Sequence, residues 1–280
     1  MHSPLALRRL ARDRWALVGA TLLALVAFSA IGASWLAPAD PLQGTLTESL
    51  RSPSTGHWLG TDVQGRDVLA RVLHGARLSL AVGVVSQGIA LVLGLALGLA
   101  AGYYGRWVDA SVMRLADVTL AFPPLLLLVA IAAAVRPTMP VVLLVIGLVG
   151  WAGMARVARA QVLVVRALDY VQAARALGGR DWRIVLGHVA PNVLGPVFVA
   201  ATLGVGGAIM AEAALSFVGL GAQPPTPSWG AMVAEGRDLL RTAPWVSLFP
   251  GLAIGMVVLG VNLLGDGLQD ALDVRTMRSV

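Results

Sequence analysis

Residues 170–192 read YVQAARALGGRDWRIVLGHVAPN, the longest polar, arginine-bearing interruption between the hydrophobic runs of this chain. Two short helical patterns meet here at Gly178 and Gly179, and glycine permits a sharp turn between them. The first pattern places its apolar members on one face. Its characteristic residues are Gln172, Ala173, Ala174 and Leu177. The stretch therefore predicts a compact helix–turn–helix element that another protein can hold.

The second helical pattern follows the two glycines and contains Trp182, Ile184, Val185 and Val189. Asp181 stands immediately before it, where a carboxylate can accept hydrogen bonds as an N-cap. Pro191 then either stops this helix or opens the next one, because proline lacks a backbone N–H.

The composition places the chain outside the range of soluble domains. It is 57% hydrophobic and 13% charged over 280 residues. Several uncharged runs reach the roughly 17 to 25 residues that a helix needs to cross a bilayer. The short alternating pattern of an outer-membrane barrel is absent from the sequence. These features predict an all-α polytopic membrane protein, in which the lipid bilayer itself is a partner.

The residue types missing from the sequence exclude several functions. Without cysteine there is no disulfide framework, thiolate metal site or cysteine nucleophile, and without lysine there is no GxxxxGK[ST] phosphate loop. The chain is therefore not an ATPase. No Ser-His-Asp or paired-carboxylate arrangement indicates an enzyme. The net charge of +6 is interpreted as the basic excess of cytoplasmic loops rather than as a nucleic-acid surface.

Six spans are predicted from the uncharged runs, at residues 15–37, 78–105, 118–135, 138–155, 193–217 and 245–264. The first could be a signal peptide, but it is long for one and a retained span is favoured. Residues 106–117 are expected to form a short polar turn, and Phe122, Pro123 and Pro124 interrupt the third span early.

The arginines predict the orientation of the spans. Cytoplasmic N- and C-termini place fourteen arginines inside and seven outside, in agreement with the positive-inside rule. The segment from 156 to 191 is then cytoplasmic. We divide the chain into residues 1–76 (tail, first span and extracytoplasmic segment) and a core of five spans at 77–280.

Three further features carry structural predictions. Gly94, Gly98 and Gly102 are four apart, which is typical of a face where another helix approaches closely. The polar sequence GTDVQGRD at 60–67 is interpreted as a loop that caps the second span or meets a partner, rather than as a metal site. Glu212 lies late in the fifth span, and an ionisable group there indicates a structural or gating role, or a place on the substrate pathway.

The sequence resembles a known family at several of these places. Residues 172–191 resemble the EAA loop of permease subunits from binding-protein-dependent ABC transporters, with Ala173, Ala174, Gly178 and Pro191 matching by position. Gln172 stands where that family has glutamate. The stretches HWLGTDVQGRDVLARVLHGARLSL, AGYYGRWVD, LSFVGLGAQPPTPSWGAMVAEGR and LLGDGLQDALD are similar to the dipeptide/oligopeptide/nickel branch, and within it to the C-type subunit.

This resemblance implies a type I ABC importer permease fold in the bacterial inner membrane. It implies a heterodimer with a B-type permease, one or two cytoplasmic ABC ATPase subunits, and an extracytoplasmic substrate-binding protein. Residues 170–192 would couple this chain to the ATPases, which would carry the ATP and magnesium; no cofactor is expected on this chain. Coupling would involve Gln172, Ala173, Ala174, Leu177, Gly178, Asp181 and Pro191.

The expected substrate is a dipeptide or oligopeptide, with nickel or another small solute as the alternative. A secondary transporter or channel is a second alternative. It predicts inverted repeats in two halves, and residues 1–140 and 141–280 do not show that symmetry.

Overall fold

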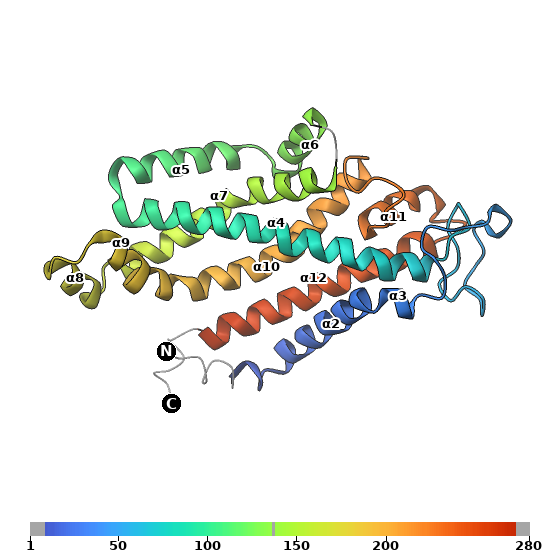
Figure 1. Ribbon diagram of the computed structural model, residues 1–280, viewed down its shortest axis with the longest axis horizontal. Helices are drawn as coiled ribbons and strands as arrows, with labels where there is room; N and C mark the ends of the chain where they lie inside the picture. The colour runs from blue at the N-terminus through green and yellow to red at the C-terminus, as the bar shows by residue number, and fades with distance from the viewer. Residues whose placement is uncertain (1–8, 136–137, 273–280) are drawn as a thin grey trace.

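The computed structural model describes residues 9–135 and 138–272, and these ranges are helical apart from loops and two isolated β-bridges. Five helices are long and apolar enough to cross a membrane (Figure 1). Within the described residues they are α2 (Arg14–Ile31), α4 (Val68–Tyr104), α7 (Met139–Val165), α12 (Trp245–Leu272) and the helical run Asp181–Phe217, most of which is α10 (Ala190–Phe217). The short α3 (Ala33–Leu36) follows α2, and a 3-10 turn, η1, covers Leu46–Glu48.

The third predicted span is a bent pair of helices. Helix α5 (Arg106–Ala121) and helix α6 (Pro124–Ala134) meet at an angle of 89°, and by length and composition the pair is either one broken span or a re-entrant segment. The break lies at Phe122, whose extended backbone is what a residue before proline prefers. The prediction of a polar turn at 106–117 was wrong, because this segment forms most of α5.

Several helices continue past the charges that limited the predicted spans. Helix α4 begins ten residues before the predicted 78, and α7 extends ten residues beyond 155. The arginines in these extensions have partners: Arg77 donates to the Ala30 carbonyl at 2.6 Å, and Arg159 pairs with Asp109. The division at 76/77 falls inside α4, and the first residues of the 156–191 segment belong to α7. The two-part division stays a prediction.

Helices α4 and α7 pack closely along the predicted glycine face. A Cβ at Gly94 would lie 2.5 Å from Cβ of Met154, and a Cβ at Gly98 would lie 2.6 Å from the Ala155 carbonyl oxygen. A Cβ at Gly102 would meet Val162 at 2.6 Å. Only glycine allows backbones this close, so the prediction of a helix-packing face is confirmed.

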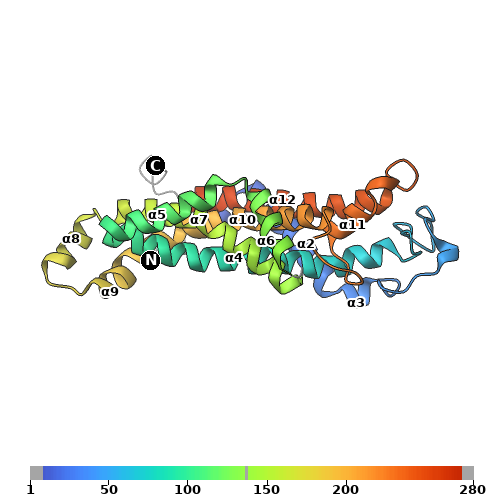
Figure 2. The same ribbon diagram turned by 90° about the horizontal axis from the view of Figure 1, so that it is seen from above.

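The two ends of the bundle differ in what they carry (Figure 2). Two short helices, α8 (Asp169–Ala176) and α9 (Asp181–Ile184), extend from one end, and residues 37–67 with α11 (Trp229–Glu235) and the 3-10 turn η3 (Arg237–Leu239) lie at the other. The start of α2 and the end of α12 lie toward the α8 end, since a Cβ at Gly195 would meet Leu272 at 3.6 Å. This agrees with termini on the side of the polar loop. Arg8, Arg136, Arg275 and Arg278 of the charge count lie outside the described residues.

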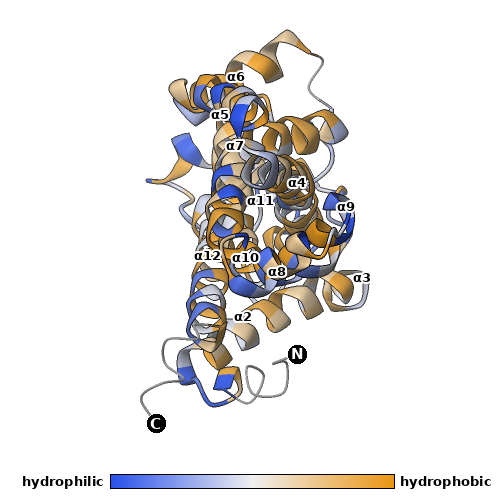
Figure 3. Ribbon diagram, turned by 90° about the vertical axis from the view of Figure 1, so that its left-hand side faces the viewer, coloured by the Kyte–Doolittle hydropathy of each residue, from blue (hydrophilic) through white to orange (hydrophobic). Residues whose placement is uncertain are grey.

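Hydrophobic residues make up much of the helices of the bundle (Figure 3), and many of their side chains are exposed on its surface. Val92, Leu126 and Val164, for example, are each more than 60% exposed. Such a surface would not be stable in water and suits contact with lipid or with other membrane helices.

Candidate functional site

The loop between α7 and α10 is a helix–turn–helix element fixed by main-chain hydrogen bonds. Helix α8 ends at Ala176 with Leu177 as its C-cap residue, and Gly178 then adopts φ 76° in the left-handed region. The Gly178 N–H donates to the Arg175 carbonyl at 3.0 Å, and the Gly179 N–H donates to the Ala174 carbonyl at 3.1 Å. This pair of bonds is the Schellman motif, which satisfies carbonyls at a helix end.

The two glycines of this turn are required for different reasons. Gly178 has open space around its Cβ position, so only its positive φ excludes other residues. A Cβ at Gly179 would lie 2.8 Å from the Ala174 carbonyl oxygen, so its requirement is steric. Both glycines were predicted at the turn, but only Gly178 was assigned to the coupling residues, and the steric requirement at Gly179 was not predicted.

Asp181 does not cap α9 as predicted. Arg180 is the N-cap residue, Asp181 is the first residue of the helix, and no side-chain capping bond forms. The Asp181 carboxylate instead accepts a hydrogen bond of 2.8 Å from the Tyr103 hydroxyl at the end of α4. The prediction was wrong because a partner 78 residues away holds the carboxylate.

Pro191 opens a helix. A π-helical turn, η2 (Val185–Val189), joins α9 to α10, and Pro191 lies in the first turn of α10. Helical backbone runs on from Asp181 to Phe217 through this π-helical turn, so Pro191 lies where α-helical structure resumes after η2. Of the two predicted possibilities, the structure has the second.

The loop buries one set of apolar side chains and exposes another. Its buried set packs into a cluster with Tyr103 and Val162 and consists of Val171, Ile184 and Val189. Ala174 packs against this cluster, whereas Ala173 is exposed. A second set points to solvent, with Leu177 88% exposed, and consists of Leu177, Trp182 and Leu186. Exposed apolar side chains gathered on one short element indicate contact with another molecule.

Gln172 connects α8 to the end of α7. Its Nε2 donates to the Arg166 carbonyl at 2.7 Å, in the last turn region of α7 where carbonyls lack helical partners. An ionised glutamate could not donate this hydrogen bond. The Gln172 side chain therefore holds α8 to the end of α7 by a hydrogen bond. The first turn of α8 forms normally with glutamine at this position.

Glu212 is fully buried where α10 meets α11. Its Oε1 accepts hydrogen bonds from Ser216 at 2.7 Å and from Ser228, the N-cap residue of α11, at 3.1 Å. Its Oε2 has no hydrogen-bond partner among the described residues. A side chain at Gly230 would lie 2.9 Å from this oxygen. These contacts favour the structural alternative for Glu212, and its role in transport stays a prediction.

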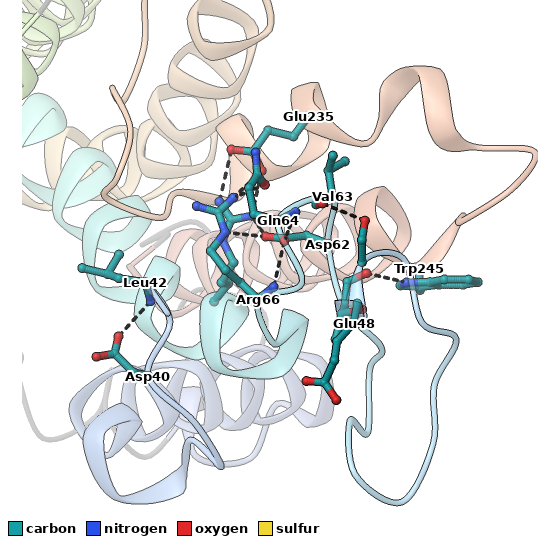
Figure 4. A network of polar contacts seen from close by, with 12 residues as sticks. Asp40, Leu42, Glu48, Asp62, Val63, Gln64, Arg66, Glu235 and Trp245 are labelled. Carbon is teal, nitrogen blue, oxygen red and sulfur yellow. Dashed lines mark hydrogen bonds and ion pairs between the residues drawn. The ribbon is translucent and has the colours of Figure 1, made fainter. Parts of the chain in front are cut away.

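A charged cluster joins residues 60–67 to α4 and α11 (Figure 4). Asp62 accepts hydrogen bonds from Arg66 at 2.7 Å and from Arg71 at 2.5 Å, and Arg71 also pairs with Glu235 at 2.7 Å. The Arg71 and Asp62 side chains are almost completely buried. The prediction for residues 60–67 was a loop that caps the second span or meets a partner, and it did not include the pairing with Arg71 and Glu235.

The same segment caps α4, as predicted. The Asp67 carboxylate accepts from the Ala70 N–H at 2.8 Å, which satisfies a free donor of the first turn. Within residues 9–135 and 138–272, no group of three or more His, Cys, Asp or Glu side chains could hold a metal ion. The arrangement is that of a capped helix end held by ion pairs.

Two family models match the chain. Residues 94–278 match the model described as "Binding-protein-dependent transport system inner membrane component". Residues 3–53 match the "N-terminal TM domain of oligopeptide transport permease C". Together the two matches cover both ends of the chain.

Curated relatives are similar over nearly their whole length. The dipeptide transport system permease protein of Alkalihalophilus pseudofirmus is 44% identical, over 96% of this chain and 88% of that protein. A di/tripeptide transport system permease protein of Pseudomonas aeruginosa is 44% identical, over 94% and 89%. A glutathione transport system permease protein of Pectobacterium atrosepticum is 41% identical, over 95% and 89%.

A solved structure shares the fold. A chain of the MetNI methionine ABC transporter in an inward-facing conformation superposes with a TM-score of 0.55 at 19% identity. The match covers 72% of this chain and 97% of that chain. At this identity the likeness shows the fold alone.

Proposed function

The chain belongs to the inner membrane components of binding-protein-dependent transport systems, and we propose that it is the C-type permease of an ABC importer for dipeptides or oligopeptides. It is a multi-pass inner membrane protein and a transport subunit rather than a catalytic one. The peptide substrate is supported by relatives whose names specify dipeptides, di/tripeptides and glutathione. These names favour peptides over the alternative of nickel.

The observation that carries the coupling role is the construction of the α8–α9 loop. It is anchored to the bundle by buried Val171 and Ile184, while Leu177, Trp182 and Leu186 extend outward. A rigid element with exposed apolar side chains suits insertion into a cleft of a cytoplasmic ATPase. Closure of the ATPase dimer around ATP would displace the loop, and the attached helices would move with it.

The remaining parts of the transporter are assigned from this role. A second, B-type permease would complete the translocation path by alternating access with this chain. One or two cytoplasmic ATPase subunits would hold Mg-ATP, and an extracytoplasmic binding protein would deliver the peptide. This chain would bind no nucleotide, which agrees with its lack of lysine and of a phosphate-binding loop.

The coupling role is tested by changing Gly178 in the assembled transporter. Valine at φ 76° is strained by its backbone conformation, whereas asparagine tolerates the left-handed region. Gly178→Val should abolish substrate-stimulated ATP hydrolysis in proteoliposomes while the complex still assembles, and Gly178→Asn should retain most of it. Equal stimulation in both variants would refute the role of this turn.

Assembly itself is tested by copurification. The tagged chain, extracted in mild detergent, should bring down a second permease and ATPase subunits in fixed stoichiometry. Purification of this chain alone from membranes that contain the other subunits would refute the proposal and would favour a self-sufficient transporter or channel.

A further inference from the structure

Tyr103, at the cytoplasmic end of α4, is held by both helices of the coupling loop. Its hydroxyl donates to Asp181 of α9 at 2.8 Å. The guanidinium of Arg175, on α8, lies over the Tyr103 ring at 5.1 Å from its centroid, a distance at which a cation is attracted to the ring. The two helices on either side of the Gly178 turn therefore converge on one side chain.

Burial and packing hold the Tyr103 side chain in one position between α4 and the loop, and this connection is called the joint below. The side chain is 4% exposed and packs in the apolar cluster that contains Val171 and Ile184 of the loop. Beside it, Arg166 at the end of α7 donates to the Gly102 carbonyl at 2.6 Å. The last turn of α4 is thus fastened to the loop by a hydrogen bond, a cation–π contact and apolar packing.

Helix α4 needs such a joint because it has no covalent link to the loop. The loop is continuous with α7 and α10, which it joins, whereas Tyr103 and Asp181 are 78 residues apart in the chain. Displacement of the loop therefore reaches α7 and α10 through the backbone. It reaches α4 through non-covalent contacts, indirectly through the close packing of α4 on α7 at Gly98 and Gly102 and directly at Tyr103.

Helix α4 is suited to carry a displacement across the membrane. It is one unbroken helix of 37 residues, about 55 Å long at 1.5 Å per residue. It contacts α2, α7, α10, α11 and α12 along this length. At its far end Arg71 holds Glu235 of α11 at 2.7 Å, and the Val72 carbonyl accepts a hydrogen bond from the Trp229 indole.

We propose that Tyr103 is a positioning residue that makes α4 follow the coupling loop, so that movement imposed by the ATPases reaches the extracytoplasmic end of the bundle. This inference rests on the coupling role proposed above for the loop. It adds the side chain through which the loop engages a helix to which it is not bonded.

The test uses the complete transporter in proteoliposomes, with a dipeptide delivered by the binding protein. The readout is the number of dipeptide molecules imported per ATP hydrolysed. Tyr103→Phe removes only the hydroxyl, and Asp181→Ala removes only its acceptor at an exposed position where folding is not at risk. Each should lower the ratio about tenfold, because a hydrogen bond to a charged group is among the stronger ones.

Matched variants separate a joint from general damage. Asp181→Asn keeps an acceptor oxygen for the hydroxyl and should restore the ratio to within about twofold of the parent. Tyr104→Phe changes the neighbouring, exposed tyrosine and should leave the ratio unchanged. The double variant Tyr103→Phe with Asp181→Ala should be no worse than either single variant, since both remove one contact.

The outcomes distinguish this inference from the proposed function. If Gly178→Val uncouples the transporter while Tyr103→Phe and Asp181→Ala import normally per ATP, the loop is the lever but Tyr103 is not its joint. Additive losses in the double variant would also overturn the joint. If Gly178→Val leaves coupling intact, the proposed role of the loop itself fails.

Discussion

Replacing Arg71 with methionine is expected to loosen helix α11 at the extracytoplasmic end of the bundle. Arg71 bridges Asp62 and Glu235, at 2.5 and 2.7 Å, and its side chain is 2% exposed. Methionine keeps much of the aliphatic length but leaves the almost fully buried Asp62 with one cation fewer. Removing one partner of a buried ion pair typically costs about 3–5 kcal/mol.

The cost at this site should fall at the lower end of that range. Arg66 still donates to Asp62 at 2.7 Å, so the carboxylate keeps a charged partner. The Glu235 side chain is 30% exposed, and water can replace part of what it loses. The relevant quantity is the free energy of separating α11 from the rest of the bundle. We expect Arg71→Met to lower it by about 3 kcal/mol, which makes the population with α11 separated (the open population) roughly 100-fold larger.

The open population can be measured by thiol labelling, because the chain has no cysteine. Met232→Cys places a single thiol on α11 at a position with 0% exposure. The rate of its reaction with a membrane-impermeant maleimide should rise about 100-fold when Arg71→Met is added, in proportion to the open population.

Arg51→Met provides the control for the labelling experiment. Arg51 pairs with Glu48 at 3.1 Å, but the two side chains are 57% and 35% exposed. Such a pair contributes about 0–1 kcal/mol, so the labelling rate should change less than about fivefold. Equal labelling rates for the parent and Arg71→Met would refute the reasoning that the charged cluster holds α11 in place.

Three other changes have defined outcomes. Gly98→Ala should destabilise the protein by about 1–3 kcal/mol through overpacking against α7, whereas Gly88→Ala, in open space, should not; thermal unfolding in detergent compares them. The free energy of unfolding of Glu212→Gln should lie within about 1 kcal/mol of the parent's, because the amide oxygen of glutamine still accepts hydrogen bonds from both serine hydroxyls. Glu212→Leu should lose more of the free energy of unfolding, because leucine has no acceptor for them. Gln172→Glu should speed proteolysis of the loop, since glutamate cannot donate to the Arg166 carbonyl; an unchanged cleavage rate would contradict this.

The spans and the turn were predictable because their signals are local. Uncharged runs long enough for a bilayer marked the five long helices, and the sixth run falls on the pair α5 and α6 that the structure bends at Phe122. The spacing of Gly94, Gly98 and Gly102 predicted a packing face, although not that α7 would occupy it. The two glycines at 178 and 179 predicted a turn, and the left-handed φ of Gly178 agrees with that prediction.

The errors at the ends of elements have a common cause. Charges were taken to end the spans, but Arg159 and Asp109 neutralise each other between α7 and α5. The polar segment 106–117 could then be helical, since its acidic side chains are paired with arginines of α7. Whether a charge ends a helix depends on whether a partner lies beside it, and the partner comes from another part of the chain.

The sequence by itself determined that this chain is a helical membrane protein, where its long apolar helices lie, and where the polar helix–turn–helix loop between α7 and α10 lies. These properties follow from the transfer of side chains to lipid and from local backbone preferences, which act over a few neighbouring residues. Only the tertiary structure decided that Asp181 binds Tyr103 and that Arg71 binds Glu235, across 78 and 164 residues of chain. Such pairs depend on how the helices are placed side by side, and helix placement is set by the packing of the whole bundle.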